Sequence, residues 1–145
     1  LDADTTGLLI LTNDGDFANK LAHPRYGLDK TYRAAITHSM TDDDLYNLKK
    51  GVLVEGRKVR VSRALLIGRK MIELTIHEGR KHVVKKLLRA IGYHVRELSR
   101  IRVGPLSLHG LPIGHWRLLN KNEVGVLRTA VEMREKLARP AQHTR

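Results

Sequence analysis

Three cationic side chains are spaced so that they could bind an anion. Lys81, Lys85 and Arg89 follow one another at intervals of four residues, within a stretch whose apolar residues predict a helix over residues 81–91. Side chains four residues apart lie on one side of a helix, and each like-charged pair destabilises an isolated helix by about 0.2–0.5 kcal/mol. The predicted helix contains no carboxylate to offset this repulsion. We therefore predict that an anion, either from elsewhere in the protein or from a ligand, faces this side of the helix.

Two other clusters have the residue types of a metal site but not its spacing. His77, Glu78 and His82 resemble the zinc-hydrolase pattern, in which two residues separate the Glu from the second His. Here three residues separate them, and Gly79 predicts a turn. Residues 42–44 are three consecutive Asp at a predicted helix start, where carboxylates favour the positive end of the helix dipole and point in different directions. The sequence therefore predicts no metal site.

Net charge points to a polyanionic partner. The chain of 145 residues has a formal net charge of +12, with 27 Lys and Arg against 15 Asp and Glu. Residues 1–55 carry a net charge of −3, whereas residues 56–145 carry +15. This asymmetry favours nucleic acid bound mainly by the second part of the chain. The alternative is a basic surface that is only solvated.

Composition excludes several classes of protein. The chain has no Cys, which removes disulfides and thiolate nucleophiles, and we expect a reducing, cytosol-like compartment. No apolar run approaches the length of about 20 residues that spans a membrane. No Ser lies in the Gly-x-Ser-x-Gly context of a serine hydrolase. Six aromatic residues are too few and too scattered for a base-stacking platform, so any nucleic acid must be bound through its backbone and one pocket.

The hydrophobic pattern predicts one α+β domain over residues 1–139, followed by a disordered tail at residues 140–145. The first predicted helix follows a cap offered by residues 13–16 and ends near residue 22. The second begins after Thr41 and ends at Gly51, the third covers residues 81–91, and the fourth follows the Asn120-x-x-Glu123 capping pattern. Predicted strands cover residues 7–11, 30–36, 52–77 with breaks at 55–56 and 68–70, 95–108 with a break at 104–105, and 116–119. The expected architecture is a mixed, mostly antiparallel sheet with flanking helices.

Four segments resemble the motifs of one enzyme family. Residues 1–15 read LDADTTGLLILTNDG. Leu-Asp followed by Thr-x-Gly-Leu-Leu and Thr-Asn-Asp-Gly is typical of the catalytic motif of bacterial ribosomal RNA pseudouridine synthases of the RsuA/RluB type. Residues 23–34, 78–87 and 100–117 resemble the later motifs of that family, in the same order. The chain thus looks like a member of this family, which implies the pseudouridine synthase catalytic-domain fold.

Two departures from the family pattern matter. The third motif normally has a Gln and two Arg where this chain has Val83, Lys85 and Lys86. In the family the first of those Arg pairs with the catalytic carboxylate, so the resemblance passes this role to Lys85. The Gly-Arg before Leu1, the family's amino-terminal S4 RNA-binding domain and the first strands of its catalytic domain are absent. We therefore expect the chain to be a fragment of a longer polypeptide, incomplete at its N-terminus.

The resemblance implies a reaction in which a uridine of ribosomal RNA is detached from its ribose at N1, turned and rejoined through C5, without metal or cofactor. Asp2 matches the catalytic carboxylate, which either attacks the sugar or base or removes a sugar proton. Lys85 would keep Asp2 ionised in a partly desolvated pocket, although less rigidly than an Arg. Tyr32 would lie against the uracil ring and take part in proton transfer; by itself it fits a half-buried strand residue. Asp4 is the competitor, on the same face as Asp2 if the segment is extended.

Basic side chains would hold the rest of the RNA. Contacts to phosphates are expected from Arg80, Lys81, Lys86, Arg89 and Arg100, although each could be only a solvated charge. Such contacts would offset the cost of unstacking the base, on the order of a few kcal/mol. The expected partner is ribosomal RNA, and the protein is expected to be a cytoplasmic monomer. Two alternatives stay open: a non-enzymatic RNA-binding or ribosome-associated module on the same scaffold, and a basic ribosomal-type protein without a pocket.

Overall fold

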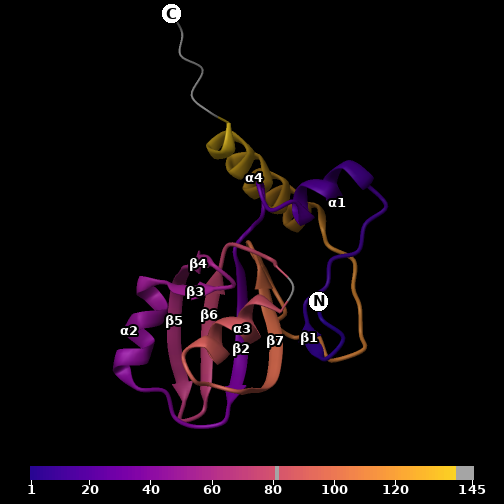
Figure 1. Ribbon diagram of the computed structural model, residues 1–145. Coiled ribbons are helices and arrows are strands. Elements are labelled where there is room, and N and C mark those ends of the chain that lie inside the picture. The colour runs from indigo at the N-terminus through magenta and orange to yellow at the C-terminus, as the bar shows by residue number, and fades with distance from the viewer. Residues whose placement is uncertain (81, 140–145) are drawn as a thin grey trace, which may run out of the picture.

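A mixed sheet is the centre of the computed structural model, which describes residues 1–80 and 82–139 (Figure 1). The described elements, in chain order, are β1 (Thr5–Gly7), α1 (Gly15–Ala22), β2 (Lys30–Ile36), α2 (Asp42–Lys50), β3 (Val52–Val54), β4 (Arg57–Val59), β5 (Val61–Gly68), β6 (Met71–Ile76), α3 (Val83–Ala90), β7 (Val95–Val103), β8 (Leu106–Ser107) and α4 (Lys121–Ala138). The predicted α+β class is therefore confirmed. The tail predicted at residues 140–145 lies outside the described residues.

Strand β2 lies at the middle of the sheet, whose order is β1-β7-β2-β6-β5 with β8 on β7. It pairs antiparallel with both β6 and β7, whereas β1 pairs parallel with β7, so the sheet is mixed and mostly antiparallel as predicted. Successive strand residues point to opposite faces. Tyr32, Ala34 and Ile36 accordingly face one side and are buried there, while Thr31 and Arg33 face the other.

Helices α2 and α3 cover the face of the sheet that carries Tyr32 (Figure 1). Leu87 and Leu88 of α3 are fully buried in the main hydrophobic core, together with Leu48 of α2. The predicted helix over residues 81–91 is thus confirmed over Val83–Ala90, as α3, and Gly92 has a φ of +92° just after it, while residue 81 lies outside the described residues. This packing fixes the N-terminal end of α3 against the sheet.

Helices α1 and α4 form a second, smaller core beside the sheet (Figure 1). Phe17 of α1 packs with Leu127 and Val131 of α4, and this cluster continues to Val103 at the end of β7. Both helices begin with the predicted caps: Asp14 accepts from the backbone of Phe17 at 3.0 Å, and Asn120 forms a capping box with the helix. The predicted helix starts are therefore confirmed.

Two predicted strands are wrong. Strand β1 ends at Gly7, so residues 8–11 lie beyond it, and no strand is present at residues 116–119 of the described chain. Gly7 has a φ of +115°, and a Cβ on it would lie 2.2 Å from the Arg100 carbonyl oxygen, so the backbone turns away at this close approach. Both segments are apolar, but they have no partner strand to complete a ladder. Leu11 and Leu118 are consequently more than 80% exposed.

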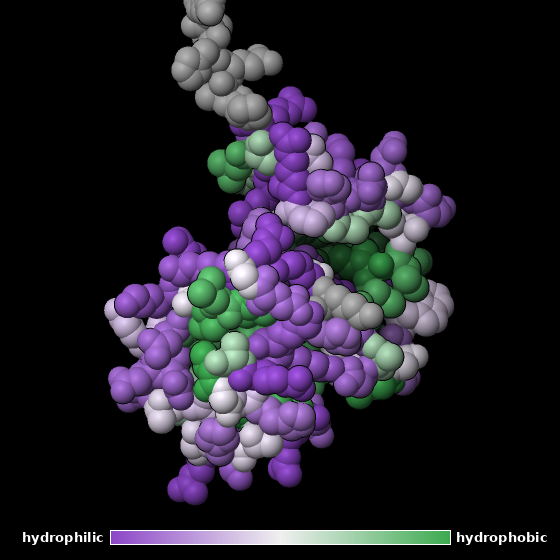
Figure 2. All heavy atoms as spheres, viewed as in Figure 1, coloured by the Kyte–Doolittle hydropathy of each residue, from purple (hydrophilic) through white to green (hydrophobic). Residues whose placement is uncertain are grey.

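The surface is largely hydrophilic on the face shown in Figure 2, with apolar groups gathered in a few places. One lies over the loops that join β1 to α1 and β8 to α4, which carry exposed Leu9 and Trp116. In the described part of the chain, no helix has both the length and the apolar character to cross a bilayer.

The start of α4 provides a pH-dependent contribution to stability. Arg117 donates two hydrogen bonds to Glu123, at 2.6 and 2.7 Å, and the backbone amide of Asn120 donates another. Together these hydrogen bonds lower the pKa of Glu123 to about 2. A lowered folded-state pKa stabilises the fold above the unfolded value of 4.5, and this stabilisation is lost as the pH falls towards about 2. We expect the melting temperature of Glu123→Gln to fall less than that of the wild type over this interval, as measured by thermal melts followed by circular dichroism. Arg117→Met should behave like Glu123→Gln; parallel curves for all three proteins would contradict the assignment.

Candidate functional site

Asp2 lies in a turn directly before β1, beside the N-terminal end of α3. The Thr5 amide donates to the Asp2 carbonyl at 3.0 Å, and β1 then pairs with β7. One Asp2 carboxylate oxygen lies 2.9 Å from Nδ1 of His82, and the Asp2 side chain is only 19% exposed. The carboxylate is therefore partly withdrawn from water and held by one defined neighbour.

His82 owes its position to an uncommon backbone conformation. Its φ of +57° and ψ of 22° place it in the left-handed region immediately before the first residue of α3. This conformation costs a residue with a Cβ roughly 1–2 kcal/mol, and such strain is typical of functional sites. The sequence signal for His82 is its place in the third motif, whereas the spacing with His77 and Glu78 tests it only as a zinc ligand. Its pairing with Asp2 was therefore missed.

Lys85 pairs with Asp4 instead of Asp2, so the expected pairing of Lys85 with Asp2 is wrong in this structure. The reason is local: residues 2–5 form a turn, so the two carboxylates do not share one face as they would in an extended segment. Each meets a different cation from the start of α3. The hydrogen bond from Lys85 is the main cause that lowers the pKa of Asp4, and the charge of His82 adds to it. Asp2, Asp4, His82 and Lys85 thus form one cluster in which each carboxylate meets a basic side chain.

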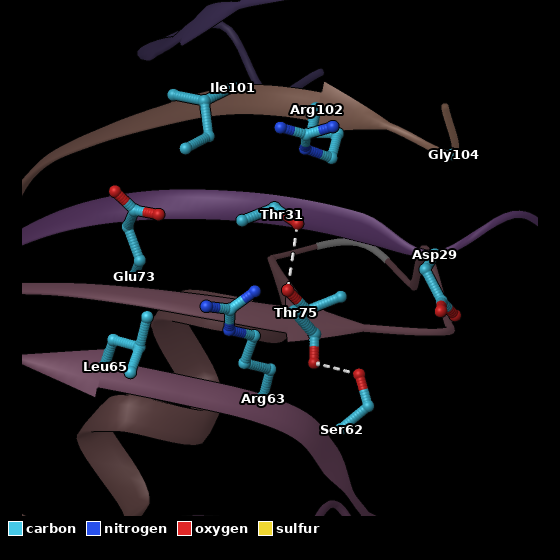
Figure 3. Close-up of a pocket in the computed structure, with 10 residues that line it drawn as sticks. All are labelled: Asp29, Thr31, Ser62, Arg63, Leu65, Glu73, Thr75, Ile101, Arg102 and Gly104. Atoms are coloured by element: carbon cyan, nitrogen blue, oxygen red, sulfur yellow. Dashed lines mark hydrogen bonds between the residues drawn. The ribbon is translucent and has the colours of Figure 1, made fainter. Parts of the chain in front are cut away.

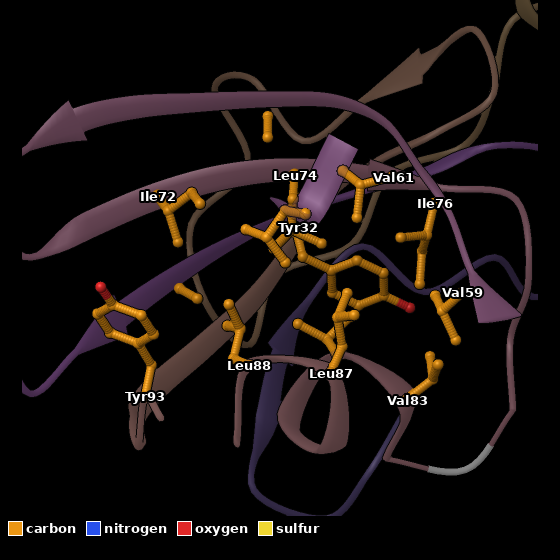
Figure 4. Close-up of a cluster of buried hydrophobic side chains, with 14 of the residues drawn as sticks. Tyr32, Val59, Val61, Ile72, Leu74, Ile76, Val83, Leu87, Leu88 and Tyr93 are labelled. Carbon is orange, nitrogen blue, oxygen red and sulfur yellow. The ribbon is translucent and has the colours of Figure 1, made fainter. Parts of the chain in front are cut away.

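Tyr32 lies in the main core and is 8% exposed. Its ring packs between the sheet and α3 in the same cluster as Val83 and Leu87, with the hydroxyl directed towards the Val59 side in the view of Figure 4. Tyr32 is therefore more buried than the half-buried strand residue that its sequence position alone predicts, and its ring does not lie open to a base in this structure. It packs against the same helix that carries Lys85.

Several of the predicted RNA contacts already have carboxylate partners. Arg80 donates two hydrogen bonds to Glu78, at 2.8 and 3.0 Å, which raises the pKa of Arg80. Lys86 lies 2.7 Å from a carboxylate oxygen of Glu55 and lowers the pKa of that carboxyl group. Arg89 is exposed. The sequence predicted an anion opposite the cationic side of this helix. At Lys85 that anion is the carboxylate of Asp4, from the protein itself.

Two further predicted residues complete the comparison. The side chain of Arg100 donates to the Leu8 carbonyl at 2.9 and 2.7 Å, so it ties β7 to the segment after β1. Lys81 lies outside the described residues. Within the described ranges, no group of three or more His, Cys, Asp or Glu side chains is arranged to hold a metal ion.

A hollow of about 560 Å³ lies on the opposite face of the sheet (Figure 3). Thr31 and Thr75 share a hydrogen bond of 2.9 Å at its floor, and Arg63 and Arg102 project into it. Because Thr31 precedes Tyr32 in one strand, this hollow faces away from the buried tyrosine. None of the predicted site residues lines it.

The fold matches that of a known enzyme class. A solved structure described as a pseudouridylate synthase superposes with a TM-score of 0.82 and 30% sequence identity, over 88% of this chain and 56% of that chain. The family model described as RNA pseudouridylate synthase matches residues 1–90. The chain belongs to the RNA pseudouridylate synthase family, and the resemblance inferred from its motifs is confirmed.

Curated relatives agree with this membership. An uncharacterized RNA pseudouridine synthase of Aquifex aeolicus is 41% identical over 138 residues, which cover 92% of this chain and 55% of the relative. The ribosomal large subunit pseudouridine synthase B of Bacillus subtilis is 42% identical, over 91% of this chain and 57% of the relative. The chain thus spans about half the length of the curated relatives that it matches.

Proposed function

We propose that this chain carries the catalytic centre of a ribosomal RNA pseudouridine synthase, with Asp2 as the catalytic carboxylate. The observation that carries the proposal is the Asp2 side chain itself, which is withdrawn from water and held 2.9 Å from His82. It occupies the aspartate position of the family's first motif. A carboxylate in such a position can act as a nucleophile or as a base once a substrate excludes the remaining water.

The proposed reaction is an isomerisation and needs no external reactant. The bond between N1 of uracil and C1′ of the ribose breaks, and a bond between C5 and C1′ forms. C5 loses its proton and N1 gains one, so the atoms and charges balance. Asp2 either forms a transient covalent bond or removes a sugar proton, and both routes require it to be ionised. His82 lies against the Asp2 carboxylate, and Lys85 pairs with the neighbouring Asp4.

Access to the base requires it to leave its stack, at a cost on the order of a few kcal/mol. The excess positive charge of residues 56–145 supports binding of the surrounding phosphates. Exposed Arg89 and the paired residues Arg80 and Lys86 are proposed contacts, as is Lys81. For the two paired residues, a phosphate would compete with the internal carboxylate. Tyr32 is proposed to meet the uracil with the hydroxyl end of its ring.

Mapping of modified nucleotides tests the function directly. We expect a strain that lacks the gene to lose pseudouridine at one or a few positions of its ribosomal RNA, and a plasmid copy to restore them. The readout is chemical probing of pseudouridine across both ribosomal subunits. An unchanged pseudouridine map in the deletion strain would contradict the proposal and favour a non-enzymatic RNA-binding module.

A further inference from the structure

Two cationic residues lie on the paired strands β2 and β7 of the sheet. Lys30 is the first residue of β2, and Arg100 lies within β7. Burial is the main cause that lowers the pKa of Lys30, and the nearby charge of Arg100 lowers it further, against the opposing effect of Asp29. Both side chains are only partly exposed. Two like charges therefore lie on adjacent, paired strands in a place with limited access to water.

Both cations donate to backbone carbonyls. Lys30 Nζ donates to the Leu28 carbonyl at 3.2 Å, and Arg100 donates to the Leu8 carbonyl. Carbonyl oxygens orient a cation but do not neutralise it. Among the described residues, neither side chain has a carboxylate within salt-bridge distance. Asp29 directly precedes Lys30 in the sequence but pairs with other residues.

Two carboxylates adjacent in sequence to this place, Asp29 before Lys30 and Glu78 before Gly79, are already engaged elsewhere. Asp29 accepts from His77 at 3.0 Å and forms an ion pair with Arg134 at 3.1 Å. Glu78 uses both of its oxygens for Arg80. An uncompensated positive charge in a partly buried position is costly unless an anion joins it. This place is therefore suited to a ligand that brings its own negative charge.

Its location connects the pair to the proposed reaction. Lys30 and Tyr32 are two residues apart in one strand and share a face of the sheet. Arg100 is the register partner of Tyr32 on one side and of Gly7, at the end of β1, on the other. Lys30 Nζ also lies beside the loop before α3, since a Cβ on Gly79 would be 3.7 Å from it.

We propose that Lys30 and Arg100 together bind one phosphate of the RNA backbone, next to the uridine that is isomerised. The inference rests on the proposed function and adds Lys30 to its binding residues. A phosphate at this place receives one point charge from the ammonium group and a planar donor group from Arg100. It would fix the ribose relative to Asp2, so its main effect is on RNA affinity and on the position of the sugar.

Single neutral phosphates in the RNA identify the contact. The target RNA, found by the mapping experiment, is synthesised with one uncharged methylphosphonate at each position around the uridine in turn. We expect one position at which the wild type loses affinity about 10-fold or more, as a charge-assisted contact requires. Lys30→Gln should bind unmodified RNA with an affinity reduced by a similar factor. Its affinity should fall little further when that one phosphate is replaced by the methylphosphonate. Its slope of log affinity against log salt should also be smaller by about 1.

Arg33→Gln is the matched control, because Arg33 lies on the same strand but on the opposite face and already pairs with Glu73 at 2.8 Å. Its affinity and salt slope should equal those of the wild type. Lys30→Arg keeps the charge and should keep the affinity, which separates loss of charge from loss of folding. The phosphate scan on the wild type needs no variant at all.

The outcomes are distinct. The phosphate contact would be overturned if Lys30→Gln reduced RNA affinity by the same factor at every methylphosphonate position. The proposed function would remain intact in that case, provided that the wild type still forms pseudouridine. Absence of pseudouridine formation by the wild type on any ribosomal RNA would instead overturn the function, and the inference with it.

Discussion

Replacement of Asp2 by Asn is expected to abolish pseudouridine formation while RNA binding survives. Asn has nearly the same shape and can still interact with His82, but it cannot ionise, so neither nucleophilic attack nor proton removal is available. The expected loss in single-turnover rate is about three orders of magnitude or more. The measurement is release of the C5 hydrogen, as tritium, from labelled target RNA, together with the dissociation constant of the RNA.

Asp4→Asn is the control for this experiment, because Asp4 lies in the same turn and its side chain is 74% exposed. It loses one contact with Lys85, and its rate should stay within about 10-fold of the wild type, the range of an exposed ion pair. A fully active Asp2→Asn protein beside an inactive Asp4→Asn protein would move the catalytic role to Asp4. Normal rates in both would remove the turn from the mechanism.

Replacement of Lys85 by Met should also be severe, with an expected loss of about 100-fold or more, since a neighbouring cation favours an ionised carboxylate by roughly one to three powers of ten. Lys85 contacts Asp4 in the structure, and the expected loss follows if its flexible ammonium group moves to Asp2, two residues away in the same turn, when the RNA binds. Met keeps the length and apolar contacts of the stem, so α3 should fold normally. Lys85→Arg should keep or raise the rate.

Lys86→Met separates catalysis from RNA binding, because Lys86 is the next residue of α3 and pairs with Glu55 away from the turn. We expect it to weaken RNA affinity without changing the single-turnover rate at saturation. If Lys85→Met turned over normally while His82→Gln did not, the counter-charge of Asp2 would belong to His82 alone. Single-turnover rates at saturating RNA distinguish these cases.

Local signals in the sequence predicted most of the helices and strands. The caps at Thr41 and Asn120 and the glycine at residue 51 act within one turn of chain, so their effect is visible without knowledge of the rest of the fold. The wrong strands at residues 7–11 and 116–119 have the apolar composition of strands. What they lack is a neighbouring strand, and pairing between distant segments is not encoded in local pattern.

The residue types of the site were predictable, but their pairing was not. The family motif indicated Asp2 and Lys85 by position alone. Which cation meets which carboxylate depends on the turn at residues 2–5 and on the left-handed backbone of His82. Both are properties of a few dihedral angles that no periodicity reveals. An extended segment would have placed the two carboxylates differently.

The packing of Tyr32 has a consequence for how variants at this position are interpreted. Loss of a buried aromatic ring typically costs about 3–5 kcal/mol, which is a large share of the stability of a domain of this size. A genetic screen that scores activity in cells would therefore register Tyr32→Ala as defective through degradation of the polypeptide, whatever the phenol contributes to chemistry. Tyr32→Phe removes the hydroxyl oxygen but keeps the ring, so it separates the contribution of this side chain to packing from its contribution to the reaction.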